Sequence, residues 1–183
     1  MVSAGAILAH PFAGVAAEVL VRARRVRLVL TDCDGVLTDG TVFYSAYGED
    51  MIRFGRRDGH GVERLRAAGL DAGIVSRETS EIVARRAEKL GIRELHLGVR
   101  EKGPLVLAIA RRLRLAPEEV AFVGDDLPDL PALRAAGLAA CPADALEPVR
   151  AEAHYVCRAS GGQGVFREVV ELVLFARDSV NGS

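Results

Sequence analysis

Residues 26–40, VRLVLTDCDGVLTDG, join a short apolar run to a loop rich in aspartate. Residues 26–30 have the length and the branched apolar composition of a buried strand, and the acidic loop follows directly. This alternation of strand-like runs (26–30, 72–75, 95–97, 120–123, 138–140) with helix-like segments (60–68, 79–90, 104–114, 128–136) continues along the chain. It predicts an α/β fold with a doubly wound, mostly parallel sheet of the Rossmann-like type.

Two segments depart from the alternation. Residues 41–56, TVFYSAYGEDMIRFGR, carry alternating apolar residues around a Gly-Glu-Asp turn, which predicts a β-hairpin inserted after the first strand. Residues 13–24 have the spacing of an amphipathic helix that leads into the fold. Gly69, Gly91 and Gly137 are expected to end three of the helices as C-terminal caps.

The chain has 183 residues, a length that suits one domain with a core of its own. Hydrophobic residues make up 50%, charged residues make up 27%, and the net charge is -1, which is typical of a soluble globular protein. No basic field indicates nucleic acid as a partner. The predicted division is a leading segment (1–24), one main domain (25–177) and a tail (178–183).

The apolar start of the chain and its cysteines bear on location. No Lys or Arg precedes Arg22, and Pro11 interrupts a run too short to span a bilayer, so we expect neither a signal peptide nor a membrane span. Residues before Pro11 are expected to be loose. Cys33, Cys141 and Cys157 are odd in number and form no CxxC pair, so neither a disulfide framework nor a zinc site is expected. These features favour a cytoplasmic protein.

Polar side chains follow four of the predicted strands. Asp32 and Asp34 come directly after the first, Ser76 after the second, and Lys102 shortly after the third. The fourth is followed by residues 124–129, GDDLPD, which contribute three more carboxylates: Asp125, Asp126 and Asp129. Because ligands bind at the carboxyl ends of parallel strands, these side chains are expected to share one site.

The combination is suited to phosphoryl transfer. Carboxylates from two strand ends can hold a hard cation, which can bridge phosphate oxygens. Lys102, the Ser76 hydroxyl and loop amides would balance the remaining charge on the transferring group. A carboxylate in line with phosphorus can attack it to give an aspartyl phosphate. A second carboxylate two residues on could protonate the leaving alcohol and then deprotonate water.

The order and spacing of these residues resemble the four motifs of the haloacid dehalogenase superfamily. The resemblance implies a phosphatase that depends on Mg²⁺, with Asp32 as the nucleophile and Asp34 as the acid/base. The other implied roles are metal binding, phosphate contact and support: Asp32, Asp125 and the Asp34 backbone carbonyl for the metal, Ser76 and Lys102 for phosphate, and Asp126 and Asp129 as supporting residues.

Residues 57–61 (RDGHG) and 161–168 (GGQGVFRE) are similar to the sugar-acid phosphatase branch of that superfamily, and the resemblance spans about residues 24–176. Members of the branch have no separate cap domain. The resemblance implies a homotetramer in which the hairpin of one subunit shields a neighbour's active site. Arg57 and Arg167 are then expected to contact substrate, with Arg167 on a flexible C-terminal segment that meets the substrate carboxylate.

The second motif bears on the substrate. Phosphatases of the eight-carbon sugar acid, 3-deoxy-D-manno-octulosonate 8-phosphate, usually carry Thr-Gly-Arg there, whereas this chain has Ser76-Arg77-Glu78. Glu78 with Lys89 resembles the phosphatases of nine-carbon sugar acids. The expected substrate is therefore 2-keto-3-deoxynononate or N-acylneuraminate 9-phosphate, with the octulosonate ester as the alternative. Arg77, in place of the usual glycine, could either contact the substrate or crowd it.

Structural roles are the alternatives for several of these residues. Ser76 could cap a helix that begins near residue 79. Arg57 and Asp58 could cap the helix that begins near residue 59, and Glu78 and Lys89 could form solvated ion pairs of little energetic value. Residues 161–164 lack the ending of a Walker nucleotide loop, so that interpretation is poor.

Two other classes of function are open. The chain could be a non-catalytic partner of an acylneuraminate cytidylyltransferase, but the presence of both Asp32 and Asp34 counts against this. It could also be a mutase that returns the phosphoryl group to substrate. A mutase must retain its intermediate, and the chain offers no cap domain for that purpose.

Overall fold

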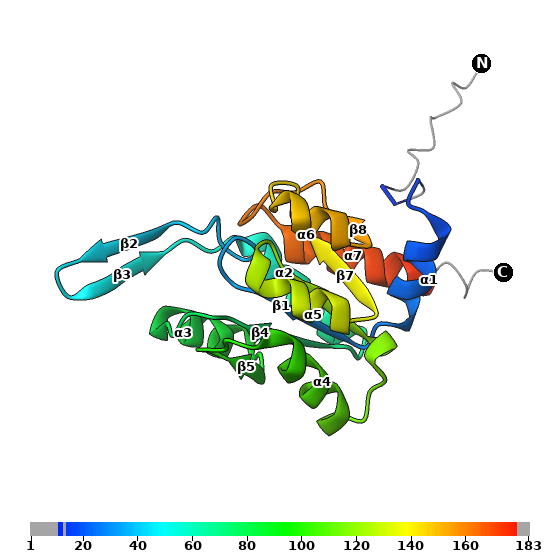
Figure 1. Cartoon of the computed structure of the whole chain (residues 1–183), viewed down its shortest axis with the longest axis horizontal. Coiled ribbons are helices and arrows are strands. Elements are labelled where there is room, and N and C mark those ends of the chain that lie inside the picture. Colours follow the sequence, from blue (N-terminus) through cyan, green and yellow to red (C-terminus); the bar gives the residue numbers. More distant parts are fainter. Residues whose placement is uncertain (1–10, 13, 179–183) are drawn as a thin grey trace, which may run out of the picture.

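The computed structural model describes residues 11–12 and 14–178 of the chain (Figure 1). Its centre is a six-stranded sheet in which all neighbouring strands are parallel. In spatial order the strands are β5 (Glu94–His96), β4 (Asp71–Val75), β1 (Leu28–Thr31), β6 (Val120–Val123), β7 (Leu138–Cys141) and β8 (Tyr155–Val156). The predicted doubly wound α/β fold is confirmed.

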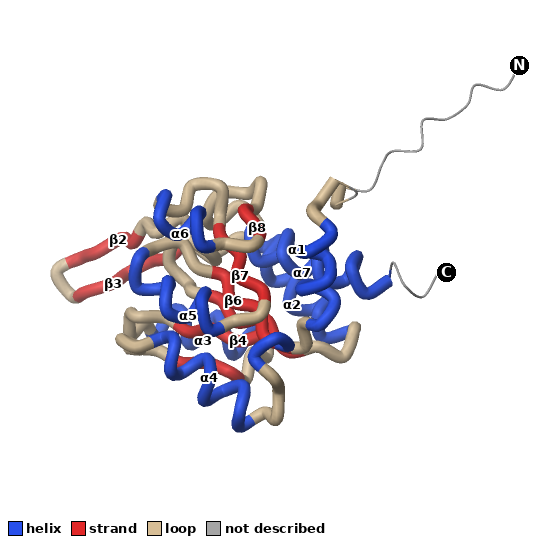
Figure 2. Tube along the Cα trace, turned by 45° about the vertical axis from the view of Figure 1, so that its right-hand side comes forward, coloured by secondary structure: helices blue, strands red, loops and turns tan. Residues whose placement is uncertain are grey.

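Helices cover both faces of the sheet (Figure 2). One face carries α1 (Ala17–Arg25), α2 (Arg56–Ala67), α3 (Glu81–Leu90) and α7 (Val165–Asp178), and the other carries α4 (Lys102–Arg112), α5 (Leu130–Ala135) and α6 (Glu147–Glu152). Side-chain alternation in β1 serves both cores, because Val29 faces the first set and Leu28 and Leu30 face the second. Each of these three is fully buried, which contributes roughly 1.5–3 kcal/mol per side chain.

The order of the strands in the sheet determines where a ligand-binding crevice lies. From β1 the chain moves outward to β4 and β5, then returns to the other side of β1 for β6, β7 and β8. The loops that leave β1 and β6 therefore run in opposite directions and open a crevice between them, which is where doubly wound sheets bind ligands. Asp32 follows β1 and Asp125 lies just beyond β6, so this crevice receives the predicted catalytic carboxylates.

The predicted hairpin is present as a separate two-stranded antiparallel sheet, β2 (Val42–Ser45) and β3 (Gly48–Ile52), which projects from the body of the molecule (Figure 1). The predicted position of its turn is wrong. The turn lies at residues 46–47, and the Gly-Glu-Asp residues belong to β3. Gly48 leaves the turn with φ 118°, a conformation that L side chains rarely adopt, so the glycine marks the end of the turn rather than its centre.

Several helix boundaries differ from the predictions. The helix predicted at 60–68 begins at Arg56, so Arg57 and Asp58 lie inside α2 and do not cap it from outside. The helix predicted at 79–90 begins at Glu81 and is capped by Ser80, whose Oγ accepts from the Val83 amide, so Ser76 is not its cap. The segment predicted as helix from 128 begins with a short 3₁₀ turn, η2 (Leu127–Asp129), before α5. A second such turn, η1 (Pro117–Glu119), precedes β6.

Two of the three predicted glycine caps are confirmed. Gly91 caps α3 with φ 64°, and Gly69 follows α2 with φ 72°. Gly137 is a different case, because α5 ends at Ala135 and its C-cap residue, Ala136, is extended. A Cβ on Gly137 would overlap the backbone of Glu118, so close packing explains this glycine.

The termini bear on three predictions. The loose segment before Pro11, residue 13 of the predicted leading helix and residues 179–183 of the tail lie outside the described residues. Residues 14–16 of the predicted helix are described but not helical, and α1 starts at Ala17. Within residues 11–12 and 14–178, no helix has the length and apolar character needed to cross a bilayer.

The segment predicted to close flexibly over the site is packed in place. Gly162 donates its amide to the Val36 carbonyl, at 3.0 Å, and a Cβ on Gly161 would overlap the carbonyl oxygen of Gly35. The helix α7 that follows is held at its first turn by Asp58, whose Oδ1 accepts from the Arg167 amide at 3.0 Å. The 161–164 segment is thus a fixed support beneath the loop after β1.

Candidate active site

A cavity of about 390 Å³ lies at the carboxyl ends of the strands, over the crevice between β1 and β6. Most of the sequence-predicted site residues line it: Asp32, Asp34, Ser76, Glu78, Lys102, Asp125, Asp126 and Asp129. Three predicted substrate contacts, Arg57, Lys89 and Arg167, do not line it within this chain. The structure therefore gathers the residues from four strand ends and leaves the outlying cations apart.

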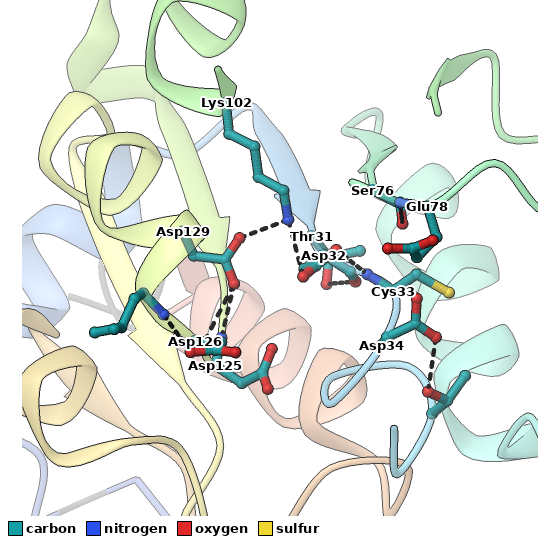
Figure 3. A network of polar contacts seen from close by, with 12 residues as sticks. Thr31, Asp32, Cys33, Asp34, Ser76, Glu78, Lys102, Asp125, Asp126 and Asp129 are labelled. Atoms are coloured by element: carbon teal, nitrogen blue, oxygen red, sulfur yellow. Dashed lines mark hydrogen bonds and ion pairs between the residues drawn. The ribbon is translucent and has the colours of Figure 1, made fainter. Parts of the chain in front are cut away.

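Lys102 is the centre of a buried charge network (Figure 3). It is the first residue of α4, its side chain is 1% exposed, and its Nζ lies 2.8 Å from Asp32 Oδ2 and 2.6 Å from Asp129 Oδ1. Burial alone would lower the pKa of Lys102, but the two carboxylates outweigh it and raise the pKa. The Lys102 ammonium therefore stays charged although it is buried.

Asp129 shapes the loop after β6. Its Oδ1 is occupied by Lys102, and its Oδ2 accepts from the backbone amides of Asp125, at 3.0 Å, and Asp126, at 3.4 Å. Both oxygens of this buried carboxylate therefore accept hydrogen bonds. Asp129 fixes the lysine and the Asp125 loop relative to each other.

Asp125, unlike Asp129, has a side-chain oxygen that accepts no hydrogen bond from the described residues. Its Oδ1 is buried and has no hydrogen-bond partner among the described residues. A Cβ on Gly35 would overlap the Asp125 carboxylate, so only glycine lets the loops after β1 and β6 approach this closely. Burial, followed by the charges of Asp129 and Asp32, raises the pKa of Asp125 to about 8. The Asp125 carboxylate therefore lacks a positive partner.

The donor set fits a divalent cation. Asp32, Asp125 and Asp129 each offer one oxygen, and these oxygens lie within 4.8 Å of one another. Three carboxylates and one ammonium, that of Lys102, give a formal charge of -2 when all are ionised, which a divalent cation would balance. Burial and the charge of Asp129 also raise the pKa of Asp32, to about 7. An oxygen-only set of this kind suits Mg²⁺.

Asp34 and Ser76 occupy the other side of the cavity. The Asp34 side chain points away from the three-carboxylate cluster and its Oδ1 accepts a hydrogen bond from Thr38 Oγ1, at 3.4 Å (Figure 3). Burial raises the pKa of Asp34, and Glu49 and Glu78 add to the effect. Ser76 is 1% exposed at the end of β4, where its Oγ accepts from the Glu78 amide at 3.2 Å. A hydroxyl and a carboxyl group thus face the cavity opposite the cluster.

The remaining predicted substrate contacts lie at the rim of the cavity, as Glu78 does, or outside it. Glu78 and Lys89 are both exposed, and no ion pair joins them within the described part of the chain. Arg57 is exposed on α2, and Arg167 pairs with Glu171 on its own helix at 2.5 Å. Their predicted roles in substrate binding stay predictions.

Sequence reasoning missed one lining carboxylate that it could have found. Asp144 lines the cavity, and its Oδ1 accepts from the Gly161 amide at 3.0 Å. It follows β7, so the rule that ligand-binding residues follow strand ends, applied to the fifth predicted strand, points to it. Asp39, in the acidic loop after β1, is a second carboxylate that lines the cavity and for which the sequence predicts no role.

The fold and this acidic site define the class of the haloacid dehalogenase-like hydrolases, and the model of that family matches residues 56–137. The 3-deoxy-D-manno-octulosonate 8-phosphate phosphatase of Yersinia pestis is 37% identical over 169 residues, which cover 92% of this chain and 90% of the relative. The chain therefore belongs to the haloacid dehalogenase-like hydrolases, in the branch that contains the octulosonate 8-phosphate phosphatases, and is a phosphomonoester hydrolase.

Solved structures give the same result. The cobalt-bound phosphatase of Haemophilus influenzae has a TM-score of 0.84 at 36% identity, covering 86% of this chain and 92% of that one. The phosphatase of Moraxella catarrhalis, solved with a magnesium ion, a phosphate ion and a KDO molecule, has a TM-score of 0.85 at 33% identity, covering 90% of this chain and 95% of that one. The predicted superfamily and branch are confirmed.

Proposed function

We propose that the chain is a Mg²⁺-dependent phosphatase that hydrolyses 3-deoxy-D-manno-octulosonate 8-phosphate through an aspartyl phosphate. The observation that carries the phosphatase chemistry is the buried network of Lys102, Asp32 and Asp129 beside the unpartnered oxygen of Asp125. The substrate is supported by the relatives, which are named for the octulosonate ester at 35–37% identity. This reverses the order expected from the sequence, in which the nine-carbon esters came first.

The nine-carbon esters are the second candidate. They are favoured by Glu78, which lines the cavity at the position where the octulosonate phosphatases usually carry arginine. Lys89, the other residue behind that expectation, does not line the cavity. A non-catalytic role is set aside, because the chain belongs to a hydrolase family and retains the carboxylates of its site.

The side chains divide the reaction between them. Mg²⁺, bound by Asp32, Asp125 and the Asp34 carbonyl, would offset charge on the phosphate oxygens. An Asp32 oxygen bonds to phosphorus while the bond from phosphorus to the ester oxygen breaks, and Asp34 gives its proton to the departing alkoxide. Asp34 then takes a proton from water, whose oxygen displaces Asp32 and releases phosphate.

Lys102 and Ser76 hold the reacting groups. The Lys102 ammonium lies against Asp32, so it keeps the nucleophile in place and balances charge as the phosphoryl group arrives. The Ser76 hydroxyl, which already accepts from the Glu78 amide, has its proton available to donate to a phosphate oxygen. Asp126 lies at the exposed rim, and Asp129 supports Lys102 and Asp125 as described above.

The test is phosphate release from the three sugar-acid phosphates, with and without Mg²⁺, by the wild type and by Asp32→Asn. We expect Mg²⁺-dependent turnover, highest with the octulosonate ester, and loss of turnover in Asp32→Asn with an unchanged circular dichroism spectrum. Asp71→Asn is the matched control and should keep wild-type turnover, because Asp71 is exposed at the start of β4 and does not line the cavity. A wild type without Mg²⁺-dependent turnover would refute the proposal, and a preference for a nine-carbon ester would replace the substrate.

We also propose a homotetramer in which the hairpin meets a neighbouring subunit. The hairpin exposes Phe43 (53%), Tyr44 (72%), Tyr47 (100%) and Met51 (62%), which is an unusual concentration of large apolar side chains on a projecting element. Light scattering of the wild type and of a Tyr44→Ser, Tyr47→Ser variant tests the proposal. An unchanged mass in the variant, or a monomeric wild type, counts against it.

We also propose a cytoplasmic location, which the three buried free cysteines support.

A further inference from the structure

The cavity is strongly acidic for a site that takes an anionic substrate. Among the described residues that line it, eight are acidic and two are basic: Asp32, Asp34, Asp39, Glu78, Asp125, Asp126, Asp129 and Asp144 against Arg77 and Lys102. A phosphate ester of a sugar acid brings a dianionic phosphate and a separate carboxylate. Each of these groups needs a positive partner to enter such a cavity.

The Lys102 ammonium and a bound divalent cation would both be paired with carboxylates of the cavity. Lys102 is shared between Asp32 and Asp129, and a divalent cation would be shared between Asp32 and Asp125. At the rim, Asp39 forms an ion pair with Arg53. The phosphate subsite therefore uses all the positive charge of the cavity floor, and none remains there for the substrate carboxylate.

Arg77 is the exception. It follows Ser76 at the end of β4, lines the cavity and is exposed. Its guanidinium forms no hydrogen bond or ion pair with any described residue, although carboxylates line the same cavity. Of the two cations that line the cavity, Arg77 is thus the one that forms no ion pair with an acidic residue of the described chain. A guanidinium in this situation can bind an incoming carboxylate in bidentate fashion.

We propose that Arg77 binds the carboxylate of the substrate and so makes the site selective for phosphate esters that carry a second anionic group. The inference rests on the proposed phosphatase function and names the residue of this site that reads the sugar acid. Glu78 is its neighbour on the same rim. Because Glu78 repels a carboxylate and accepts hydrogen bonds from hydroxyls, the pair sets which end of the sugar lies on which side.

The experiment compares two esters and three variants. The esters are octulosonate 8-phosphate and a phosphate of a neutral sugar, D-arabinose 5-phosphate. The variants are Arg77→Ala, Arg77→Lys and, as a control, Arg85→Ala. Arg85 is also exposed, but it lies on α3 and does not line the cavity. Thermal melts check that each variant is folded. Initial rates at saturating Mg²⁺ give kcat and KM for every pair.

We expect Arg77→Ala to raise KM for the sugar acid about 10- to 100-fold with kcat little changed, because one charge-assisted contact is lost. For the neutral ester kcat/KM should change less than about twofold, Arg77→Lys should recover part of the loss, and Arg85→Ala should match the wild type. An equal loss for both esters would overturn the inference, because it would assign Arg77 to phosphate. Unchanged KM for the sugar acid would also overturn it.

A binding measurement separates this inference from the proposed reaction. The free sugar acid, octulosonate without phosphate, is titrated calorimetrically into the wild type and Arg77→Ala in the presence of Mg²⁺. Weaker binding by the variant supports the carboxylate contact even if the wild type hydrolyses none of the esters, a result that would refute only the phosphatase proposal. Equal affinity for the two proteins overturns the carboxylate contact whatever the turnover.

Discussion

Lys102 and Asp129 form an ion pair in which each side chain is only 1% exposed, with 2.6 Å between Nζ and Oδ1. The pair joins the start of α4 to the 3₁₀ turn after β6, and its two residues are 27 positions apart in the chain. Removing charged groups from water is costly, so each member needs the other. The network around Asp32 is thus also part of what holds the fold together.

Replacement of Lys102 should be costly for stability. Lys102→Met leaves Asp32 and Asp129 buried without their positive partner, and we expect a loss of about 3–5 kcal/mol in the free energy of unfolding. Urea denaturation measures it. Lys89→Met is the control, because Lys89 is exposed, and it should change stability by less than about 0.5 kcal/mol. Equal stabilities for the two variants would contradict the role assigned to the network.

Asp125→Asn should separate stability from activity. Above the Asp125 pKa of about 8, the change removes a buried charge that has no positive partner, so in that pH range the metal-free variant should melt at or above the temperature of the wild type. It should also lose the rise in melting temperature that Mg²⁺ gives the wild type, and kcat should fall about 100- to 1,000-fold. Asp126→Asn, at the exposed rim, should keep its response to Mg²⁺. A full Mg²⁺ response in Asp125→Asn would exclude Asp125 as a ligand.

The metal-free protein should lose stability as the pH rises. Burial, with nearby carboxylates, raises the pKa of Asp32 to about 7 and that of Asp125 to about 8 from an ordinary 3.8. The folded state therefore binds these protons more tightly than the unfolded chain. Their contribution is complete below about pH 4 and is lost as the pH passes through about 7 to 8.

Urea denaturation in EDTA, at constant ionic strength, should show the free energy of unfolding falling from about pH 5 to about pH 9. The slope should be smaller for Asp125→Asn, which lacks one of the two titrating groups. Mg²⁺ should restore most stability at the alkaline end, where the carboxylates are ionised. A stability that climbs over this range in EDTA would show that other groups dominate.

Gly161→Ala tests the support that residues 161–164 give to the loop after β1. A Cβ at this position would overlap the carbonyl oxygen of Gly35, so the loop that follows Asp32 and Asp34 must shift. We expect a loss of about 1–3 kcal/mol in stability, together with a reduced kcat. Gly14→Ala, where nothing lies within 4 Å of the new Cβ, should behave as the wild type in both assays. Normal kcat in Gly161→Ala would mean that the loop does not depend on this contact.

The sheet was predictable because its strands are continuous apolar runs. Residues 120–123 match β6 without any shift, since all four side chains are buried and the run lies between Glu119 and Gly124. The strand β8, with two residues, and the six-residue helix α6 are too short to show a period of 2 or 3.6. Tertiary contacts, not local pattern, define both elements.

The site was predictable in its membership more than in its internal arrangement. Asp126 and Asp129 appear equivalent in the sequence, yet Asp129 is buried between Lys102 and the Asp125 amide, whereas Asp126 is exposed. The difference arises from the 3₁₀ turn Leu127–Asp129, which turns one side chain inward and leaves the other at the rim. The sequence predicts a flexible segment before Arg167, but Gly161 and Gly162 pack closely against the loop after β1.

The base of the hairpin is closed by the ion pair between Asp39 and Arg53, one on each side of the insertion. The strands between them hydrogen-bond to each other and not to the six-stranded sheet. Because the cost of closing a loop grows only slowly with its length, an insertion whose two ends already meet can be lengthened, shortened or exchanged at little expense to the rest of the protein. This junction is therefore a natural acceptor site for grafting, at which evolution or an engineer could redesign assembly and access while the hydrolytic machinery stays intact.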